Sequence, residues 1–589
     1  MSSTVSKIPH GSDREPWDEV KDYLPKGNIL SRPGVYLDKS DPVLISGPCW
    51  VSSLTRSQDG NDWGNVIHWI DQDGKHRHSA FPMSRLHDRG CSLATDLASL
   101  GLKVIPGKNR QLMEYLAGFE LPKDFRLQSV SKLGWLFNSD GSMVYVLPDD
   151  LISFENTEDI IFQPEEHSPT ANTMTTRGDV NHWSKYVAKP CCGNPLLIFS
   201  LCTSFAAPLL VHAGLEGGGF HLYGGSSKGK TTALQVSASV WGNGADPAAS
   251  ENSYVGRWNT TANALEGTAA AHNDGLLALD EMGVCDAKDF GKVVYDLSSG
   301  QGKARMNKNT SMRQNKSWRS LILSTGEISA KEKIEELGKR SQTGHGVRMV
   351  DIPIADGLLI DTHGQDAGDF ANELKKSAGQ YYGTAGRAFI EKLINYENNR
   401  FALSKDIVNK MESYRVALTA GRKLHSHQQR VIQRLTLLIV AGQLAVKFGL
   451  LPMNEQEIAS AIKSVLDRWL GDESNLPPDL RGIHDVKNFF IANKDSRFKS
   501  FINGDYGFQV RDIAGYIVFQ NEELILFTKP GIIEACGGHG YQSVLNEFKK
   551  RGFLKHEKDK LTDKFEIPGV SKRMRLYAIR KSFVDDDLL

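Results

Sequence analysis

Gly224-Gly225-Ser226-Ser227-Lys228-Gly229-Lys230-Thr231 matches the phosphate-binding pattern G-x-x-x-x-G-K-[ST] at every position. The sequence before this stretch predicts a short strand over residues 219–223, and the sequence after it predicts a helix that opens at Thr232. Glycines let the backbone curl so that its N–H groups point at phosphate oxygens, and the helix N-terminus favours anions. We therefore expect residues 224–232 to bind a nucleotide, with Lys230 at the β- and γ-phosphates and Thr231 ligating Mg²⁺.

An apolar run that ends in two acids follows downstream, Leu276-Leu277-Ala278-Leu279-Asp280-Glu281. Such a run is typical of a buried parallel strand, and open α/β sheets bind ligands at the carboxyl ends of their strands. We expect Asp280 to hold Mg²⁺ through its water shell and Glu281 to polarise the attacking water, because phosphoryl transfer depends on positioning and charge neutralisation. The alternative is the end of an ordinary core strand.

The next predicted core strand, residues 318–327, again ends in polar residues. Ser324 or Thr325 could sense the γ-phosphate or orient the water. The alternative for both is a role in capping a helix or turn.

One more strand is predicted over residues 346–353, with Arg348 opening it and Arg340 in the polar loop before it. An arginine supplied across a subunit interface stabilises the transition state in ring ATPases, by analogy with the arginine finger. Arg348 is the first candidate for this role and Arg340 the second. A surface salt bridge is the alternative for either residue.

Residues 300–319 form a polar segment that contains no acid and lacks an apolar face, so we expect a loop or hairpin. Its basic residues are Lys303, Arg305, Lys308, Arg313, Lys316 and Arg319. A hairpin that carries lysine and arginine can grip a phosphate backbone without reading its sequence. We expect Lys303, Arg305 and Lys308 to contact DNA, with a solvated basic loop as the alternative.

Motifs spread over most of the chain carry a resemblance to a known family. They are Asp62-Trp63-Gly64, Leu133-Gly134-Trp135, Gly218-Gly219-Phe220-His221-Leu222-Tyr223-Gly224, Leu279-Asp280-Glu281, Gly302-Lys303-Ala304-Arg305 and Leu323-Ser324-Thr325-Gly326-Glu327. Through them, residues 40–475 resemble the bacterial domain-of-unknown-function 927 family of P-loop ATPases.

The resemblance implies a replicative helicase from a phage, plasmid or genomic-island module. It also implies a core like those of the hexameric helicases of superfamily III and the minichromosome-maintenance group. Superfamily III enzymes usually place Asn at the first sensor, whereas this chain has Ser324-Thr325. The departure leaves the sensor assignment open.

The fold class we expect is an α/β P-loop NTPase with an AAA+ or helicase-like core and four flanking parts. The predicted parts are a flexible tail over 1–28, an N-terminal α+β domain over 30–165, the ATPase core over 180–358, a helical lid over 359–474 and a winged-helix-like domain over 475–589. The role of the N-terminal domain stays open between an oligomer collar, a DNA-entry platform and a structural scaffold.

Two regions near the C-terminus add basic groups. In the predicted lid, Arg430 and Arg434 could serve as a second sensor, although arginines on a helix surface are usually just solvated.

In the last part of the chain, residues 541–581 hold 12 Lys/Arg and 5 Asp/Glu, a difference of +7. A helix over 541–550 followed by two strands describes a winged helix, which binds DNA or protein.

Composition agrees with a cytoplasmic machine. Lys+Arg and Asp+Glu both number 70, and a neutral total does not exclude DNA binding because charge can be segregated by region. The seven cysteines show no C-x-x-C spacing, which disfavours a disulfide framework or a zinc ribbon. Residues 195–214 are apolar enough to suggest a membrane span, but their polar residues favour a buried helix packed on the ATPase sheet. The polar N-terminus is not that of a signal peptide.

The sequence thus predicts an ATP-dependent DNA helicase or translocase that uses ATP and Mg²⁺. Its expected partners are single-stranded or forked DNA and copies of itself in a ring, for which the resemblance gives a hexamer. No membrane partner is expected. The competing hypothesis is a nucleotide-gated switch or loader, or a defence-system ATPase, that binds DNA without unwinding it.

Overall fold

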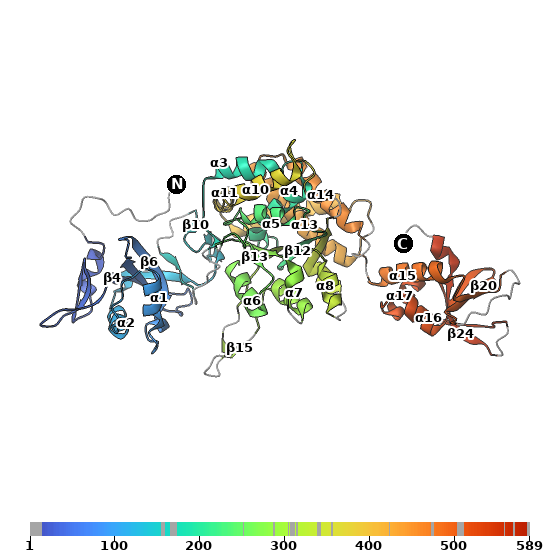
Figure 1. Ribbon diagram of the computed structural model, residues 1–589, viewed down its shortest axis with the longest axis horizontal. Helices are drawn as coiled ribbons and strands as arrows, with labels where there is room; N and C mark the ends of the chain where they lie inside the picture. The colour runs from blue at the N-terminus through green and yellow to red at the C-terminus, as the bar shows by residue number, and fades with distance from the viewer. Residues whose placement is uncertain are drawn as a thin grey trace. The chain divides into compact units, whose positions relative to one another are not determined.

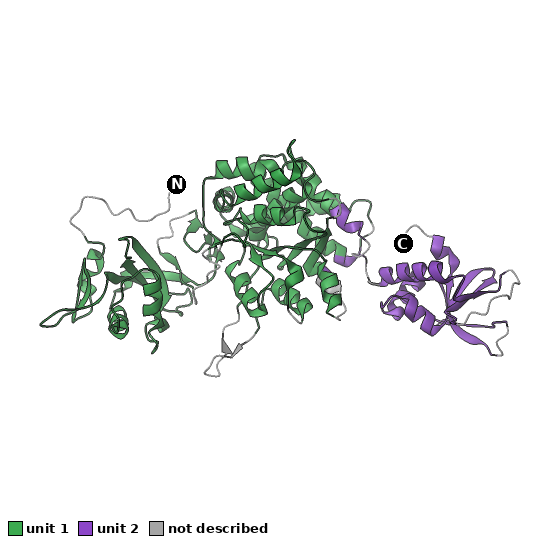
Figure 2. Cartoon of the chain, viewed as in Figure 1, with its two compact units in different colours: residues 1–341, 347–424, 428–465 green, residues 342–346, 425–427, 466–589 purple. Residues whose placement is uncertain are grey.

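The computed structural model describes residues 15–154, 159–164, 173–250, 252–286, 289–303, 305–306, 312–313, 316–337, 343–354, 357–422, 424–472, 476, 478–502, 512–558, 560–568 and 572–585. The chain divides into two compact units (Figure 2). The first consists of residues 1–341, 347–424 and 428–465, and the second of residues 342–346, 425–427 and 466–589. Together the two units mix helices with parallel and antiparallel strands (Figure 1).

The N-terminal part of the first unit contains several antiparallel hairpins. Its first sheet is β1 (Asn28–Ser31), β2 (Gly34–Leu37) and β3 (Val43–Ser46). A five-stranded sheet has the order β11 (Ile160–Phe162), β7 (Arg126–Val130), β4 (Cys49–Arg56), β5 (Gly64–Ile70) and β6 (His76–Pro82). A third sheet is β10 (Leu151–Ser153), β9 (Met143–Val146) and β8 (Gly134–Phe137), and the helices are α1 (Ser92–Ser99) and α2 (Asn109–Ala117).

The prediction of a flexible tail over residues 1–28 is wrong for its described portion, residues 15–28. A 3-10 helix, Asp18–Tyr23, follows Trp17. Trp17 and Val20 are buried in the core of the N-terminal part, and the Trp17 ring lies edge-on to Trp50 with 5.4 Å between centroids. Burial of these apolar side chains outweighs the polar composition of the segment. Residues 1–14 lie outside the described residues.

A parallel five-stranded sheet forms the centre of the first unit. Its order is β13 (Gly256–Arg257), β14 (Leu276–Asp280), β17 (Leu321–Gly326), β12 (Gly218–Tyr223) and β18 (Met349–Pro353). The helices near it in sequence are α4 (Pro195–Ala206), α5 (Lys230–Ala238), α6 (Ala262–Ala271), α7 (Phe290–Ser299), α8 (Ala330–Glu336) and α9 (Thr343–Arg348). Tyr223 pairs with Gly326 and Leu279 with Ser324, so the strands end at a common carboxyl edge.

The apolar run over residues 195–214 supplies a buried helix, as predicted. Every residue of α4 after Pro195 is buried, and Phe199 meets Phe220 of β12 with ring centroids 4.9 Å apart. In the parts of the chain that the structure describes, no helix is both long and apolar enough to cross a membrane.

The predicted helical region after residue 360 is also present. It contains α10 (Ala367–Ala378), α11 (Thr384–Tyr396), α12 (Arg400–Thr419), α13 (Ser426–Lys447) and α14 (Glu455–Leu470). The predicted start of the strand over residues 346–353 is wrong, because residues 346–348 belong to α9 and β18 begins only at Met349. Arg348 therefore closes a helix instead of opening a strand.

The second unit has its own core. Its helices are α15 (Pro478–Asn493), α16 (Lys529–Ala535) and α17 (Tyr541–Lys550). Its strands are β19 (Phe498–Ser500), β20 (Gly515–Gln520), β21 (Glu522–Phe527), β22 (Leu554–Lys555), β23 (Asp563–Phe565) and β24 (Met574–Arg580). β23 and β24 pair as the antiparallel hairpin that the sequence predicts after residue 550.

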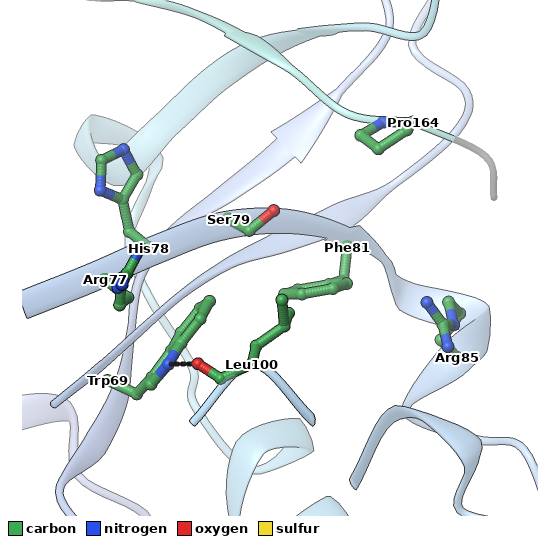
Figure 3. Close-up of a pocket in the computed structure, with 8 residues that line it drawn as sticks. All are labelled: Trp69, Arg77, His78, Ser79, Phe81, Arg85, Leu100 and Pro164. Carbon is green, nitrogen blue, oxygen red and sulfur yellow. Dashed lines mark hydrogen bonds between the residues drawn. The ribbon is translucent and has the colours of Figure 1, made fainter. Parts of the chain in front are cut away.

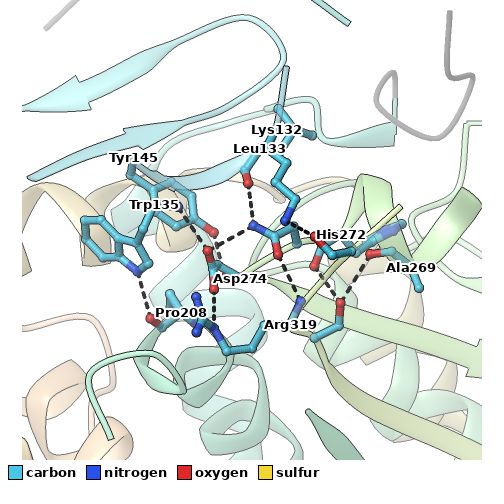
Figure 4. A network of polar contacts seen from close by, with 12 residues as sticks. Lys132, Leu133, Trp135, Tyr145, Pro208, Ala269, His272, Asp274 and Arg319 are labelled. Carbon is cyan, nitrogen blue, oxygen red and sulfur yellow. Dashed lines mark hydrogen bonds and ion pairs between the residues drawn. The ribbon is translucent and has the colours of Figure 1, made fainter. Parts of the chain in front are cut away.

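A buried polar clamp joins strand β8 to the central sheet (Figure 4). Asp274 precedes β14 and is only 1% exposed. One carboxylate oxygen accepts the Arg319 Nε–H at 2.8 Å, and the other accepts the Trp135 backbone N–H at 3.2 Å. Burial raises the pKa of Asp274, and Arg319 opposes that shift.

Neighbouring groups complete this clamp. Asn273 donates to Leu133 O at 2.7 Å and accepts from Arg319 N at 2.9 Å, while the Tyr145 hydroxyl donates to Asp274 O at 2.9 Å. At Gly134, a Cβ would lie 2.7 Å from Asn273 O, so only glycine allows this approach. The Leu133-Gly134-Trp135 motif therefore docks β8 on the sheet.

Replacing Asp274 with Ala should destabilise the protein by about 3 kcal/mol, because it leaves Arg319 and the Trp135 N–H without their carboxylate. Asp406→Ala is the matched control, since Asp406 forms an i,i+4 pair with Lys410 at a partly exposed position. Urea unfolding of both variants measures the difference. Equal losses in the two variants would contradict the clamp.

Candidate functional site

The glycine-rich loop lies where β12 ends and α5 begins. Gly224 and Gly229 have φ of 150° and 86°, and Ser227 has φ of 59°, so the loop turns through conformations that favour glycine. Residues 225–227 are exposed, and a Cβ on Gly225 would meet nothing within 4 Å. The loop is thus open on its outer side, where an anion would meet the N-terminus of α5.

Lys230, the first residue of α5, folds back into this loop. Its Nζ donates to Gly224 O at 2.7 Å and to Gly225 O at 2.6 Å. Burial lowers the pKa of Lys230, while the charges of Glu327, Glu281 and Asp280 act in the opposite direction. One ammonium and three carboxylates therefore gather at the carboxyl edge of the sheet.

Asp280 ends β14 and is held by two donors. The Thr325 hydroxyl donates to Asp280 Oδ1, as does the Glu281 backbone N–H at 3.1 Å. Asp280 is 8% exposed, whereas the Glu281 side chain is exposed. Glu281 adopts a left-handed conformation, φ 58° and ψ 63°, of the strained kind that clusters at functional sites. The strand thus ends in one fixed carboxylate and one that faces solvent.

Ser324 has a different environment from Thr325, although both end β17. The Ser324 hydroxyl is buried and accepts the Trp258 Nε1–H at 2.8 Å. It lies 3.0 Å from His221 Nδ1, and His221 Nε2 lies 2.9 Å from Ile328 O. Because a carbonyl only accepts, His221 carries its proton on Nε2 and Ser324 donates to Nδ1.

This network separates the surroundings of the two sensor candidates. Burial lowers the pKa of His221 to about 4, so the imidazole is neutral and the tautomer is maintained. The Ser324 hydroxyl donates to His221 and accepts from Trp258 inside the core, whereas the Thr325 hydroxyl donates to the candidate metal ligand Asp280. The roles of His221 and Trp258 could not be predicted from the sequence, because a buried polar network leaves no spacing pattern.

The residues of this edge fit Mg²⁺ and a nucleoside triphosphate. Mg²⁺ is usually held by one or two carboxylates together with substrate phosphates, which matches Thr231 and Asp280 beside an open anion-binding loop. No group of three or more His, Cys, Asp or Glu side chains suited to a metal occurs among the residues that the structure describes. Exposed Arg257, on β13, pairs in register with Asp280 and lies at the same edge, and Asn259 is exposed nearby.

Arg348 lies at the opposite edge of the sheet. Its neighbour Met349 pairs with Gly219 at the start of β12, and the strand then runs to Tyr223 before the loop begins. At about 3.3 Å per residue, roughly 20 Å separates Arg348, which is level with Gly218, from the loop of its own chain. The guanidinium stacks on Tyr295, 4.3 Å from the ring centroid, and Tyr295 is 45% exposed.

Arg434 supports this edge from α13, while Arg430 on the same helix is exposed. The Arg434 Nη atoms donate to Val347 O at 2.9 Å and to Gly217 O at 3.5 Å, and burial lowers its pKa to about 10. The alternative of a solvated arginine is wrong for Arg434. Its position also argues against a sensor of the nucleotide bound by its own chain.

The basic segment forms the expected hairpin, with Arg305 of β15 (Arg305–Met306) paired to Arg313 of β16 (Met312–Arg313). It leaves the sheet at the amino end of β17, the same edge as Arg348. Lys303 Nζ lies 3.9 Å from Asp296 of α7, so an acid outside the segment accompanies this lysine. Lys308 and Arg340 lie outside the described residues.

A separate pocket occurs in the N-terminal part (Figure 3). It is lined by Trp69, Arg77, His78, Ser79, Phe81, Arg85, Leu100 and Pro164. Its two arginines already pair with carboxylates, Arg77 with Asp71 and Arg85 with Asp96. No residue predicted from the sequence to form a site lies here.

Parts of the chain match known proteins. Residues 31–317 match a family described as domain of unknown function (DUF927). A solved structure titled "SCCmec type IV Cch - active helicase" is 17% identical, covers 95% of this chain and 99% of its own, and superposes with a TM-score of 0.69. The apo structure of the NrS-1 C-terminal region is 10% identical over 65% of this chain and 87% of its own, with a TM-score of 0.22. The comparison with curated proteins found no match. The chain therefore shares the fold of a structure described as a helicase.

The two polar residues that end β17 should differ in function. Thr325→Val removes a donor from Asp280, so kcat for ATP hydrolysis should fall by at least tenfold while the melting temperature changes little. Ser324→Ala should instead cost about 1–3 kcal/mol of stability, because it leaves the Trp258 N–H unpaired, and should largely preserve kcat. Steady-state ATPase and thermal unfolding measure both. The reverse pattern would assign the sensor to Ser324.

Proposed function

We propose that the protein is an ATP-dependent DNA helicase or translocase that works as a ring of identical subunits. The observation that carries this proposal is the meeting of Lys230, Asp280 and Glu281 at one edge of a parallel sheet. The basic hairpin and Arg348 occupy the other edge. The shared fold with a structure titled an active helicase supports the same function.

The nucleotide edge has the groups that hydrolysis needs. Bound ATP would supply the phosphoryl group that is transferred to water. Residues 224–232 would bind the phosphates through backbone N–H groups, with Lys230 at the β- and γ-phosphates. Thr231 and Asp280 would hold Mg²⁺, Thr325 would keep Asp280 oriented, and exposed Glu281 would polarise the attacking water.

The position of Arg348 favours an oligomer. An arginine about 20 Å from its own phosphate loop would have to act on the nucleotide of a neighbouring subunit. A hexamer follows from the resemblance to superfamily III.

We further propose that residues 180–358 are an AAA+ P-loop core, that 359–474 form its lid, that 475–589 form a winged-helix domain and that 30–165 form a separate α+β domain. We expect a cytoplasmic protein from a mobile element.

Substitutions in the basic hairpin test whether it is needed for unwinding. Replacing Lys303, Arg305 and Lys308 with Ala should abolish forked-duplex unwinding and DNA-stimulated ATPase while basal ATPase persists, because the nucleotide edge is untouched. The slope of log K for single-stranded DNA against log salt should flatten by about 2, since fewer counterions are released. The double variant Lys375→Ala/Lys376→Ala on α10 is the control for charge, and Glu281→Gln is the control for hydrolysis.

Normal unwinding by the triple variant would make the hairpin a solvated loop. Single-strand binding that depends on ATP, without unwinding by the wild-type protein, would favour the nucleotide-gated switch or loader.

The interface role of Arg348 is tested by mixing subunits. Arg348→Ala and Lys230→Ala should each be inactive alone. Mixed oligomers should regain measurable ATPase, because some interfaces then join an intact loop to an intact arginine. If stably mixed oligomers stay inactive, Arg348 is a structural residue that stacks on Tyr295.

A further inference from the structure

The residues of helix α17 in the second unit lie on two faces, one buried and one exposed. Val544, Leu545 and Phe548 are buried in the core of the unit. The exposed residues are Gln542, Ser543, Asn546, Lys549 and Lys550. At 3.6 residues per turn these five fall within about 120° of the helix circumference, so they form one continuous face.

This face contains no carboxylate. Glu547, the one acid of α17, is almost buried and accepts from Arg551 Nε at 3.1 Å and from Lys550 Nζ at 3.3 Å. Two amides and a hydroxyl occupy the first two turns, and the lysines come at the C-terminal end. A surface for phosphate alone would need only cations, so the amides indicate a different contact.

Contacts with α15 fix the orientation of α17. The turn between α16 and α17 is tied to α15, because His539 Nε2 lies 3.3 Å from Asp485. A Cβ on Gly537, which has φ of 59°, would lie 2.5 Å from the same carboxylate, so the turn needs glycine. A Cβ on Gly482 of α15 would lie 2.3 Å from Val544, which shows how closely α15 and α17 pack. The result is a helix–turn–helix whose second helix turns its polar face outward.

Basic side chains on the following hairpin are mostly neutralised. Arg575 and Lys560 pair with Glu557, Arg573 pairs with Glu566, and Arg580 and Lys581 pair with Glu522 and Glu523. The surplus of +7 over residues 541–581 therefore overstates the free charge of this surface, because Glu522 and Glu523 lie outside that range. Selective recognition would depend on the α17 face.

We propose that α17 enters the major groove of duplex DNA and reads its sequence. Gln542 and Asn546 have the amides that pair with adenine N6 and N7, and Ser543 can contact either a donor or an acceptor. N-terminal residues of a recognition helix contact bases, which matches the position of these three. Lys549 contacts a backbone phosphate. This activity is distinct from movement along a single strand, and it would choose where the protein assembles on DNA.

Selection from a randomised duplex pool tests this, with the full-length protein and no nucleotide. The wild type should enrich a defined sequence. Gln542→Ala and Asn546→Ala should each reduce the preference for that sequence over random duplex by about 5- to 150-fold. Asn488→Ala, an exposed asparagine of α15, is the matched control and should keep the preference. Lys549→Ala should weaken binding to all duplexes and lower the salt slope by about 0.9.

Single-strand-stimulated ATPase should stay unchanged in all four variants, which separates this site from the proposed function. The proposal is overturned if the wild type enriches no sequence, or if both amide variants enrich the same sequence as strongly as the wild type. It is also overturned if those variants alter subunit assembly but not duplex selectivity, since α17 would then be a protein interface.

Discussion

The register of β17 between β12 and β14 is the constraint on which the site depends. His221 pairs with Ser324 on one side, and Leu279 pairs with Ser324 on the other. This alignment brings the end of β17 level with the loop after β12 and the acids after β14. Because side chains alternate along a strand, adjacent Ser324 and Thr325 face opposite sides. One secures the core through His221 and Trp258, and the other orients Asp280.

The amino edge of the same sheet carries a second group of candidate residues. The basic hairpin leaves at the amino end of β17, and the Asp274 clamp ties β8 to Arg319 near that point. Arg348 sits at the amino end of β18, supported by Arg434. The proposed function places nucleotide contacts at one edge of this sheet and contacts with DNA and a neighbouring subunit at the other.

Much of this arrangement was predictable from sequence, because motifs with a local mechanism leave a local pattern. The loop 224–231, the strand before Asp280, the hairpin and helix α17 all follow from residue type and spacing. The tail prediction was wrong because two buried side chains, Trp17 and Val20, outweighed a polar composition. The buried state of Arg434, the Ser324 network and the neutralised C-terminal charges depend on residues far apart in sequence, so no spacing pattern records them.

In the proposed ring, the carboxyl edge of one subunit and the amino edge of its neighbour form a single catalytic site. A cryo-electron microscopy structure of the full-length protein with Mg²⁺ and a non-hydrolysable ATP analogue would show this site. We expect phosphates on the 224–231 loop, Mg²⁺ at Thr231 and Asp280, and the partner subunit's Arg348 directed at the γ-phosphate. A nucleotide bound at the loop with Arg348 turned away from every neighbouring subunit would contradict it.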